Sequence, residues 1–101
     1  MIAYSYHPLA ECDVREAAHY FESRSPGLGA QFRLSLLEAV TLLRQHPEIA
    51  PVLRGNLRCK VLLRFGYNII HAIESGELRI YAVVSQYRRP ESWSDRLGAG
   101  V

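Results

Sequence analysis

The chain has 101 residues, of which 49% are hydrophobic and 22% are charged, and its formal net charge at pH 7 is +2. This composition is typical of a globular protein with one modest core and argues against intrinsic disorder. No apolar run approaches the roughly 20 residues that a membrane-spanning helix needs, so no membrane partner is expected. The N-terminus has neither the basic start nor the apolar stretch of a signal peptide, which predicts a cytoplasmic protein. We expect a single domain over residues 1–101.

The cysteines and histidines do not follow the spacing of disulfide frameworks or metal sites. Cys12 and Cys59 lie far apart without a CxxC motif, which fits a reducing compartment and two small buried residues. The four histidines are scattered along the chain, at His7, His19, His46 and His71. We therefore expect no metal ion and no cofactor.

Charge is unevenly distributed between the two halves of the chain. Residues 1–52 hold four arginines and six acidic residues, a net charge of −2. Residues 53–101 hold seven arginines, one lysine and four acidic residues, a net charge of +4. A basic C-terminal half favours a face that meets an anionic partner, while scattered arginines that only solvate a surface are the alternative.

The first half predicts a strand and two helices. Ile2–Tyr6 alternates β-forming residues and is ended by His7-Pro8. From Leu9 to about Arg24, apolar residues recur at the spacing of one helix face, at Ala10, Val14, Ala17 and Phe21. A second amphipathic helix should end near Gln45, because two prolines follow. Its apolar residues are Phe32, Leu36, Ala39, Val40 and Leu43.

The stretch "SPGLG" separates the two predicted helices. Ser25 is a candidate N-cap of the second helix, and Pro26 a candidate for its first helical position. So short a connection predicts an antiparallel helical hairpin, whose apolar faces need a common cover.

The second half supplies this cover as three strands, Leu57–Leu63, Tyr67–Ile73 and Leu78–Ser85, joined by glycine-containing turns. They predict an antiparallel meander with its apolar face on the helical hairpin. The other face should be partly polar, with Arg58, Lys60, Asn68, Arg79 and Tyr81. The predicted class is α+β in the order β-α-α-β-β-β, with an antiparallel sheet packed against a helical hairpin.

After the last predicted strand, "SQYRRPESW" contains two adjacent arginines and the only tryptophan of the chain. Arg88 and Arg89 are candidates for contact with an anionic partner, or they pair with the nearby acids Glu91 and Asp95. Trp93 either joins that contact or packs the C-terminal segment onto the helices.

The order of elements resembles the RelE/ParE superfamily of toxins from type II toxin–antitoxin systems, and within it the ParE-like plasmid-stabilisation branch. The residues that carry the resemblance are "SPGLG" before the second helix, "HPE" after it, "LRFGYNIIHAI" and "YAVVSQYRRPESWSDR". It extends from about Tyr4 to Arg96. The resemblance implies a growth-inhibiting toxin that is neutralised by direct binding of a cognate antitoxin protein. An exposed edge strand is a natural place for the antitoxin to add. Arginines of the toxin would then meet acidic residues of the antitoxin, which is a further alternative for Arg88 and Arg89.

The superfamily carries two activities on one fold, so the fold leaves the target open. RelE-like toxins cleave messenger RNA in the ribosome, where several cations stabilise charge around one phosphate. ParE-like toxins block DNA gyrase by protein–protein contact. For a nuclease, the cations would be Arg58, Lys60, Arg64, Arg88 and Arg89.

Three positions favour the gyrase interpretation. Asn68 stands where the nuclease branch often has an arginine, and Ser85 where many relatives have a histidine. Trp93 is the nearest match to a tyrosine that serves some nuclease members, and an indole cannot exchange the proton. The residues expected to bind the target are Arg88, Arg89 and Trp93. A ribosome-dependent nuclease and a non-toxic binding module remain as alternatives.

Overall fold

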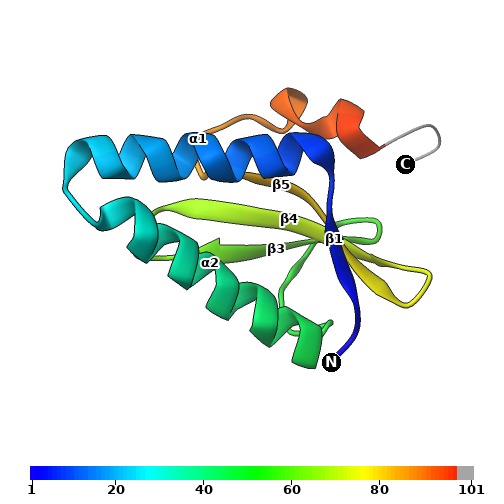
Figure 1. Ribbon diagram of the computed structural model, residues 1–101. Helices are drawn as coiled ribbons and strands as arrows, with labels where there is room; N and C mark the ends of the chain where they lie inside the picture. The colour runs from blue at the N-terminus through cyan, green and yellow to red at the C-terminus, as the bar shows by residue number, and fades with distance from the viewer. Residues whose placement is uncertain (98–101) are drawn as a thin grey trace.

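A computed structural model describes residues 1–97; the last four residues of the predicted domain lie outside the described residues. The elements are β1 (Tyr4–Tyr6), α1 (Pro8–Arg24), α2 (Leu28–Gln45), β2 (Val52–Arg54), β3 (Leu57–Leu62), β4 (Tyr67–Glu74), β5 (Glu77–Ser85) and the 3-10 turns η1 (Pro90–Ser92) and η2 (Ser94–Leu97) (Figure 1). The α+β class and the order of the predicted elements are confirmed, and the short β2 is added. Within residues 1–97, no helix is both long and apolar enough to cross a membrane.

The connection between the helices differs from the prediction. Ser25 ends α1, where its backbone N–H donates to the Phe21 carbonyl, and it does not cap α2. The N-cap of α2 is Gly27, whose φ of 86° disfavours any residue with a Cβ. The Glu22 carboxylate accepts hydrogen bonds from the backbone N–H groups of Gly27 (2.9 Å) and Gly29 (3.0 Å). This side chain from the preceding helix thus supplies the acceptor that the sequence suggested Ser25 would provide.

The second glycine of "SPGLG", Gly29, is required by the close packing of the two helices. A Cβ at this position would lie 2.6 Å from the backbone oxygen of Ala18. The two helices therefore approach each other more closely here than any other residue would permit.

The sheet has the strand order β1-β5-β4-β3-β2. The predicted meander is confirmed, since β4 pairs antiparallel with both β3 and β5. The prediction of a wholly antiparallel sheet is wrong, because β1 pairs parallel to β5, with Tyr4 opposite Leu78 and Tyr6 opposite Ile80. The partner of β1 lies more than 70 residues away, so the local pattern of Ile2–Tyr6 carries no information on its direction.

A β-bulge in β5 changes which residues face the helices. Ile70 pairs with Ala82 but the next residue, His71, pairs with Ile80, so Tyr81 is the extra residue. Tyr81 and Ala82 then both point away from the helices, whereas Ile80 and Val83 both belong to the core beneath them. Strict alternation along the sequence would have placed Ile80 and Val83 on opposite faces.

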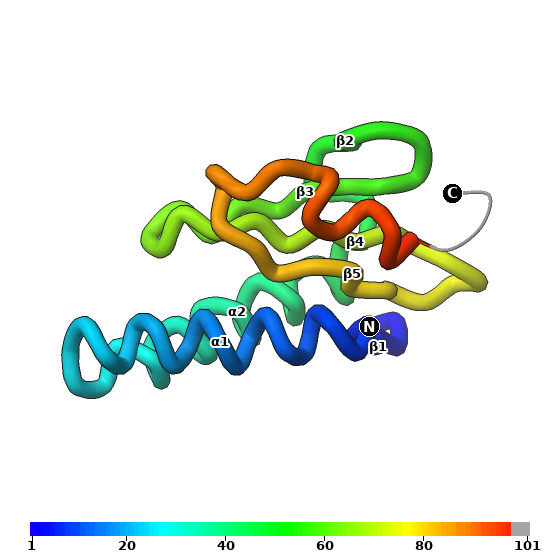
Figure 2. The backbone as a smooth tube through the Cα atoms, turned by 90° about the horizontal axis from the view of Figure 1, so that it is seen from above, coloured from blue at the N-terminus to red at the C-terminus, as the bar shows by residue number. Residues whose placement is uncertain are grey.

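Hydrophobic side chains cover both faces of the sheet. The first core lies between the sheet and the helical hairpin, and four aromatic rings pack together in it: Phe21, Phe32, Phe65 and Tyr67. The second core lies on the opposite face and includes Ile70, Val84, Trp93 and Leu97. Figure 2 shows the helices along one side of the molecule and the C-terminal turns over the strands, away from the helices.

The prediction of a partly polar second face is corrected in two respects. The C-terminal segment covers that face, so much of it is core. Arg58 and Lys60 do not belong to it, because Lys60 pairs with the helix-facing Ile69 and Arg58 lies two residues further along the same side of β3. The register of β3 against β4, which the alternating pattern alone does not fix, decides this.

Candidate functional site

The segment Gln86–Arg89, here called the arginine loop, follows β5 directly. Its backbone is held at the start, where Gln86 N–H donates to the Gly66 carbonyl at 2.9 Å and Arg88 N–H donates to the Ser85 carbonyl at 2.9 Å. Arg88 and Arg89 are exposed, and Tyr87 beside them is 87% exposed. Within residues 1–97 neither guanidinium forms an ion pair or a hydrogen bond, so the expected alternative of pairing with Glu91 or Asp95 is not observed.

The turn between β3 and β4 brings a third arginine to the same end of the sheet. Tyr67 pairs with Ser85, so this turn lies beside the arginine loop. The guanidinium of Arg64 lies 5.0 Å from the centre of the Phe65 ring and donates to the side-chain oxygen of Gln31 in α2. Arg64 is therefore fixed by two contacts, whereas the two cations of the arginine loop remain available.

Tyr67, at the start of β4, is a titratable group at the same end of the sheet. Burial raises the pKa of its hydroxyl, with Tyr20 acting in the same direction and the positive charge of Arg88 opposing them. The hydroxyl therefore stays protonated at neutral pH and is a poor general base. What this end of the sheet offers is positive charge and hydrogen-bond donors.

The five cations proposed for a nuclease do not form one cluster. Arg58 donates through Nη1 to the carbonyls of Glu48 (3.0 Å) and Ala50 (2.7 Å), which ties down the segment after α2. Lys60 lines a groove beside α2. Both lie on the helix-facing side of β3, and β4 separates them from β5. Only Arg64, Arg88 and Arg89 lie at the end where β5 leaves the sheet.

The tryptophan is placed differently from either prediction. Trp93 is 3% exposed and belongs to the second core with Leu97, against the face of the sheet that is turned away from the helices. It covers the sheet and not the helices, and its ring is not presented on the surface. The expectation that Trp93 contacts a target through its indole is therefore corrected.

Sequence reasoning missed a buried ion pair that fastens this same segment. Asp13 in α1 accepts hydrogen bonds from Arg96 at Oδ2 (2.6 Å) and at Oδ1 (3.2 Å), and Oδ2 also accepts from the Val83 backbone N–H at 3.0 Å. Arg96 donates in addition to the Tyr81 carbonyl at 3.1 Å. A signal was present, because Asp13 stands three residues after Ala10 and so falls on the apolar stripe of α1.

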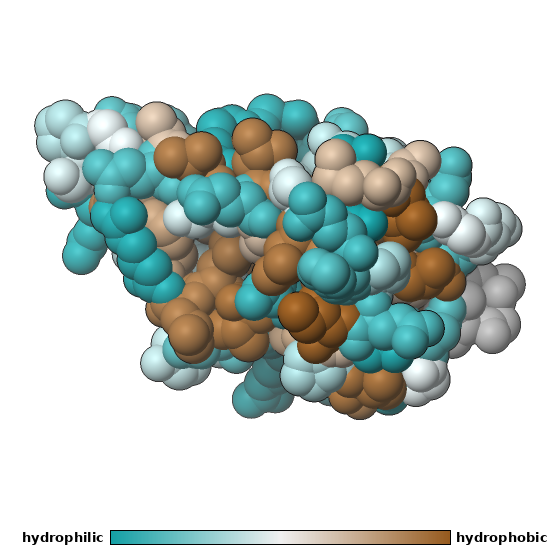
Figure 3. Space-filling view, turned by 90° about the horizontal axis from the view of Figure 1, so that it is seen from below, coloured by the Kyte–Doolittle hydropathy of each residue, from teal (hydrophilic) through white to brown (hydrophobic). Residues whose placement is uncertain are grey.

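A groove of about 670 Å³ runs between α2 and the outer edge of β3. The strand β2 pairs with β3 only as far as Arg58, and the Cys59 N–H then donates to the Pro51 carbonyl. Within the described chain, the rest of this edge has no strand beside it. Leu37, Val61 and Leu63 line the groove and are 55%, 37% and 89% exposed. Figure 3 shows apolar side chains gathered on the face seen from below.

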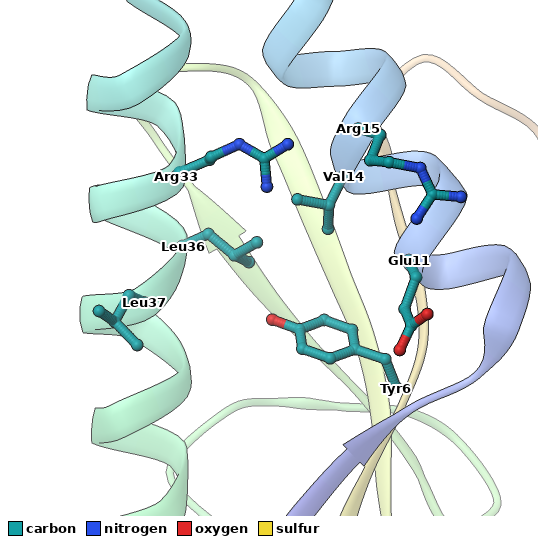
Figure 4. A pocket seen from close by; sticks show the side chains of 7 residues that line it. All are labelled: Tyr6, Glu11, Val14, Arg15, Arg33, Leu36 and Leu37. Atoms are coloured by element: carbon teal, nitrogen blue, oxygen red, sulfur yellow. The ribbon is translucent and has the colours of Figure 1, made fainter.

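A second cleft, of about 440 Å³, opens between the two helices above β1 (Figure 4). Its apolar lining includes Val14 and Leu36, and Arg15 and Arg33 stand at its rim with Glu11. Burial raises the pKa of Tyr6 in this cleft to about 12. Leu37 lines both this cleft and the groove beside β3, so α2 separates two neighbouring hollows. Both hollows suit docking of a partner segment.

No group of three metal-ligating side chains is placed to hold a metal ion within residues 1–97. The helical hairpin packed on an antiparallel meander agrees with the resemblance to the RelE/ParE superfamily. Residues 4–90 match the family model described as "ParE toxin of type II toxin-antitoxin system, parDE". The chain therefore belongs to the ParE toxin family of type II toxin–antitoxin systems.

A solved structure has the same fold. The chain is similar to one in the chromosomal ParDE TA system from P. aeruginosa, with a TM-score of 0.74 and 16% sequence identity over 84% of this chain and 96% of that chain. At this identity the likeness establishes the fold alone. Among curated proteins, none matches the chain significantly.

Proposed function

We propose that this ParE-family protein inhibits bacterial growth by contacting DNA gyrase through the arginine loop. The observation that carries the proposal is the state of Arg88 and Arg89: both are exposed, and neither is paired within the described residues. They extend from a short loop that is hydrogen-bonded to the end of a rigid sheet. Arginines of this kind are frequent hot spots in interfaces and speed association with an acidic surface.

The nuclease alternative keeps one supporting observation, which is that Arg64, Tyr67 and Arg88 lie at the same end of the sheet. Against it, Arg58 is engaged with two carbonyl groups, Lys60 lies beside α2 and Trp93 is buried. Messenger RNA cleavage needs several cations around one phosphate and a group that moves a proton. Among residues 1–97 this set is incomplete, which supports a binding mechanism.

Induced expression without antitoxin tests the proposal. We expect DNA synthesis to fall first in pulse labelling, and purified chain to cause accumulation of gyrase-cleaved plasmid. The double variant Arg88→Ala/Arg89→Ala should weaken gyrase inhibition about tenfold or more, whereas Arg54→Ala, an exposed arginine on β2, serves as the matched control. An early fall in protein synthesis with cut messages on ribosomes would instead establish the nuclease.

The cognate antitoxin, in this proposal, adds a strand to the open edge of β3 and covers the apolar groove beside it. Backbone groups that point outward from an edge strand supply affinity, and the exposed Leu37, Val61 and Leu63 supply apolar contacts. The open edge of β3 is separated from β5 by β4, so only the Leu63 end of this surface approaches the arginine loop. Neutralisation then does not require the antitoxin to occupy the arginines directly.

A further inference from the structure

We propose that the buried ion pair between Asp13 and Arg96 is a positioning device for the arginine loop. It fastens the segment Pro90–Leu97 to α1 and to β5, and it thereby determines where Arg88 and Arg89 stand. The inference rests on the proposed function of that loop. Asp13 and Arg96 are positioning residues, since neither is exposed enough to meet a target: their side chains are 5% and 6% exposed.

The ion pair forms where β5 has lost its neighbour. The short β1 accompanies β5 only up to Ile80, whose carbonyl accepts from the His7 N–H at 2.8 Å. Beyond that point the Tyr81 carbonyl and the Val83 N–H would face the edge without a strand to pair with. Arg96 donates to the first and Asp13 accepts from the second. The two side chains therefore satisfy the backbone hydrogen-bonding groups that the sheet leaves unpaired at the bulge.

The same contacts hold the C-terminal segment in one place. If the segment left, Asp13 would remain inside the protein without its counter-charge, which is strongly unfavourable. Trp93 and Leu97 would also leave the second core. Arg96 is joined to α1 and β5 at once, so its contacts exist only when helix, strand and segment are all in place.

The arginine loop is consequently anchored at both ends. On one side Gln86 is hydrogen-bonded to Gly66, and on the other the Arg89 carbonyl accepts from the backbone N–H (3.0 Å) and the hydroxyl (2.7 Å) of Ser92 in η1. The segment then continues to Trp93 and Arg96. A loop fixed in this way loses little conformational entropy on binding, so the ion pair increases the affinity of cations that it does not touch.

Trypsin provides a local readout, because it cleaves after Arg88 but not after Arg89, which precedes a proline. The variant Asp13→Asn keeps an acceptor for the Val83 N–H and removes the charge; Arg96→Gln removes the other charge. We expect each to speed cleavage after Arg88 about tenfold or more relative to cleavage after Arg24 at the C-terminal end of α1, since the loop opens locally. Glu16→Gln, an exposed acid of α1, should leave this ratio unchanged.

The same variants are measured in the gyrase cleavage assay. Asp13→Asn and Arg96→Gln should inhibit several-fold less than the parent chain at a temperature where circular dichroism reports full folding. Arg96→Lys should give intermediate results in both assays. Its single ammonium group replaces a guanidinium that reaches both carboxylate oxygens and the Tyr81 carbonyl. This variant is used in place of Asp13→Asn or Arg96→Gln if either fails to fold.

The outcomes separate the inference from the function on which it rests. If folded variants keep the parent cleavage ratio and full inhibition while Arg88→Ala loses inhibition, the ion pair only stabilises the fold and the inference is wrong. An equal rise of cleavage at every site also overturns it, because that indicates global unfolding. If Arg88→Ala and Arg89→Ala inhibit as well as the parent chain, the proposed role of the arginine loop is what fails.

Discussion

Replacing Trp93 with alanine tests the most unexpected feature of the fold, the core on the second face of the sheet. A tryptophan buries about 150–250 Å² of surface, and at about 25 cal/mol per Å² the removed contact is worth several kcal/mol. Trp93 is 3% exposed and packs with Ile70, Val84 and Leu97, so little of this is recovered by relaxation. We expect Trp93→Ala to lower the free energy of unfolding by about 3–5 kcal/mol.

Urea unfolding followed by circular dichroism measures this change. Trp93→Phe retains part of the apolar contact and should lose clearly less, and Tyr87→Ala, which removes an 87% exposed ring a few residues away, should change the free energy by less than about 0.5 kcal/mol. A loss below about 1 kcal/mol for Trp93→Ala would refute the reasoning. The ring would then be free in solution, and it would return as a candidate for target contact.

Three further predictions concern other parts of the chain. Burial lowers the pKa of His71 in the folded protein. The stability that its neutral form contributes is therefore complete above the unfolded pKa of about 6.5 and falls as the pH drops below that value. In urea titrations at several pH values, His71→Leu should reduce this loss of stability at acid pH. Gly29→Ala should cost about 1–3 kcal/mol in thermal unfolding, because the added Cβ would stand 2.6 Å from the Ala18 oxygen. Leu63→Asp should weaken antitoxin binding about tenfold or more in calorimetry and leave gyrase inhibition unchanged.

Each of these has a control and a contrary result. His19→Leu, at an exposed histidine, should lose stability at acid pH as the parent chain does. If His71→Leu also loses as much stability at acid pH as the parent chain, His71 is not the group responsible. Ala30→Gly, at the position next to Gly29, is the control for Gly29→Ala. A Gly29→Ala variant as stable as the parent chain would mean that the two helices can move apart at no cost. For Leu63, the exposed Leu9 on α1 offers a matched Leu9→Asp; unchanged antitoxin affinity in Leu63→Asp would exclude the groove beside β3.

The sequence by itself determined the helices and the meander, for a local physical reason. Apolar residues at helical spacing between Leu9 and Gln45, and alternation broken by glycine turns after Leu57, depend only on neighbours within a few positions. The exposed pair Arg88 and Arg89 was also found, because charged residues directly after an apolar strand have little to bury them. The structure confirms these elements and the exposure of both arginines.

Tertiary structure alone decided where the other residues stand. The bulge at Tyr81 shifts the alternation of β5, and the register of β3 moves Arg58 and Lys60 to the helix-facing side. The burial of Trp93 requires a second core that forms only when the C-terminal segment folds back over the sheet. Asp13 and Arg96 are 83 residues apart. The position of Asp13 on the apolar stripe of α1 signals its burial, but nothing near it in the sequence indicates its partner. The two residues meet at the edge of β5, where they bind two backbone groups that lack a strand partner, the Tyr81 carbonyl and the Val83 N–H. No local pattern in the sequence predicts where that edge lies.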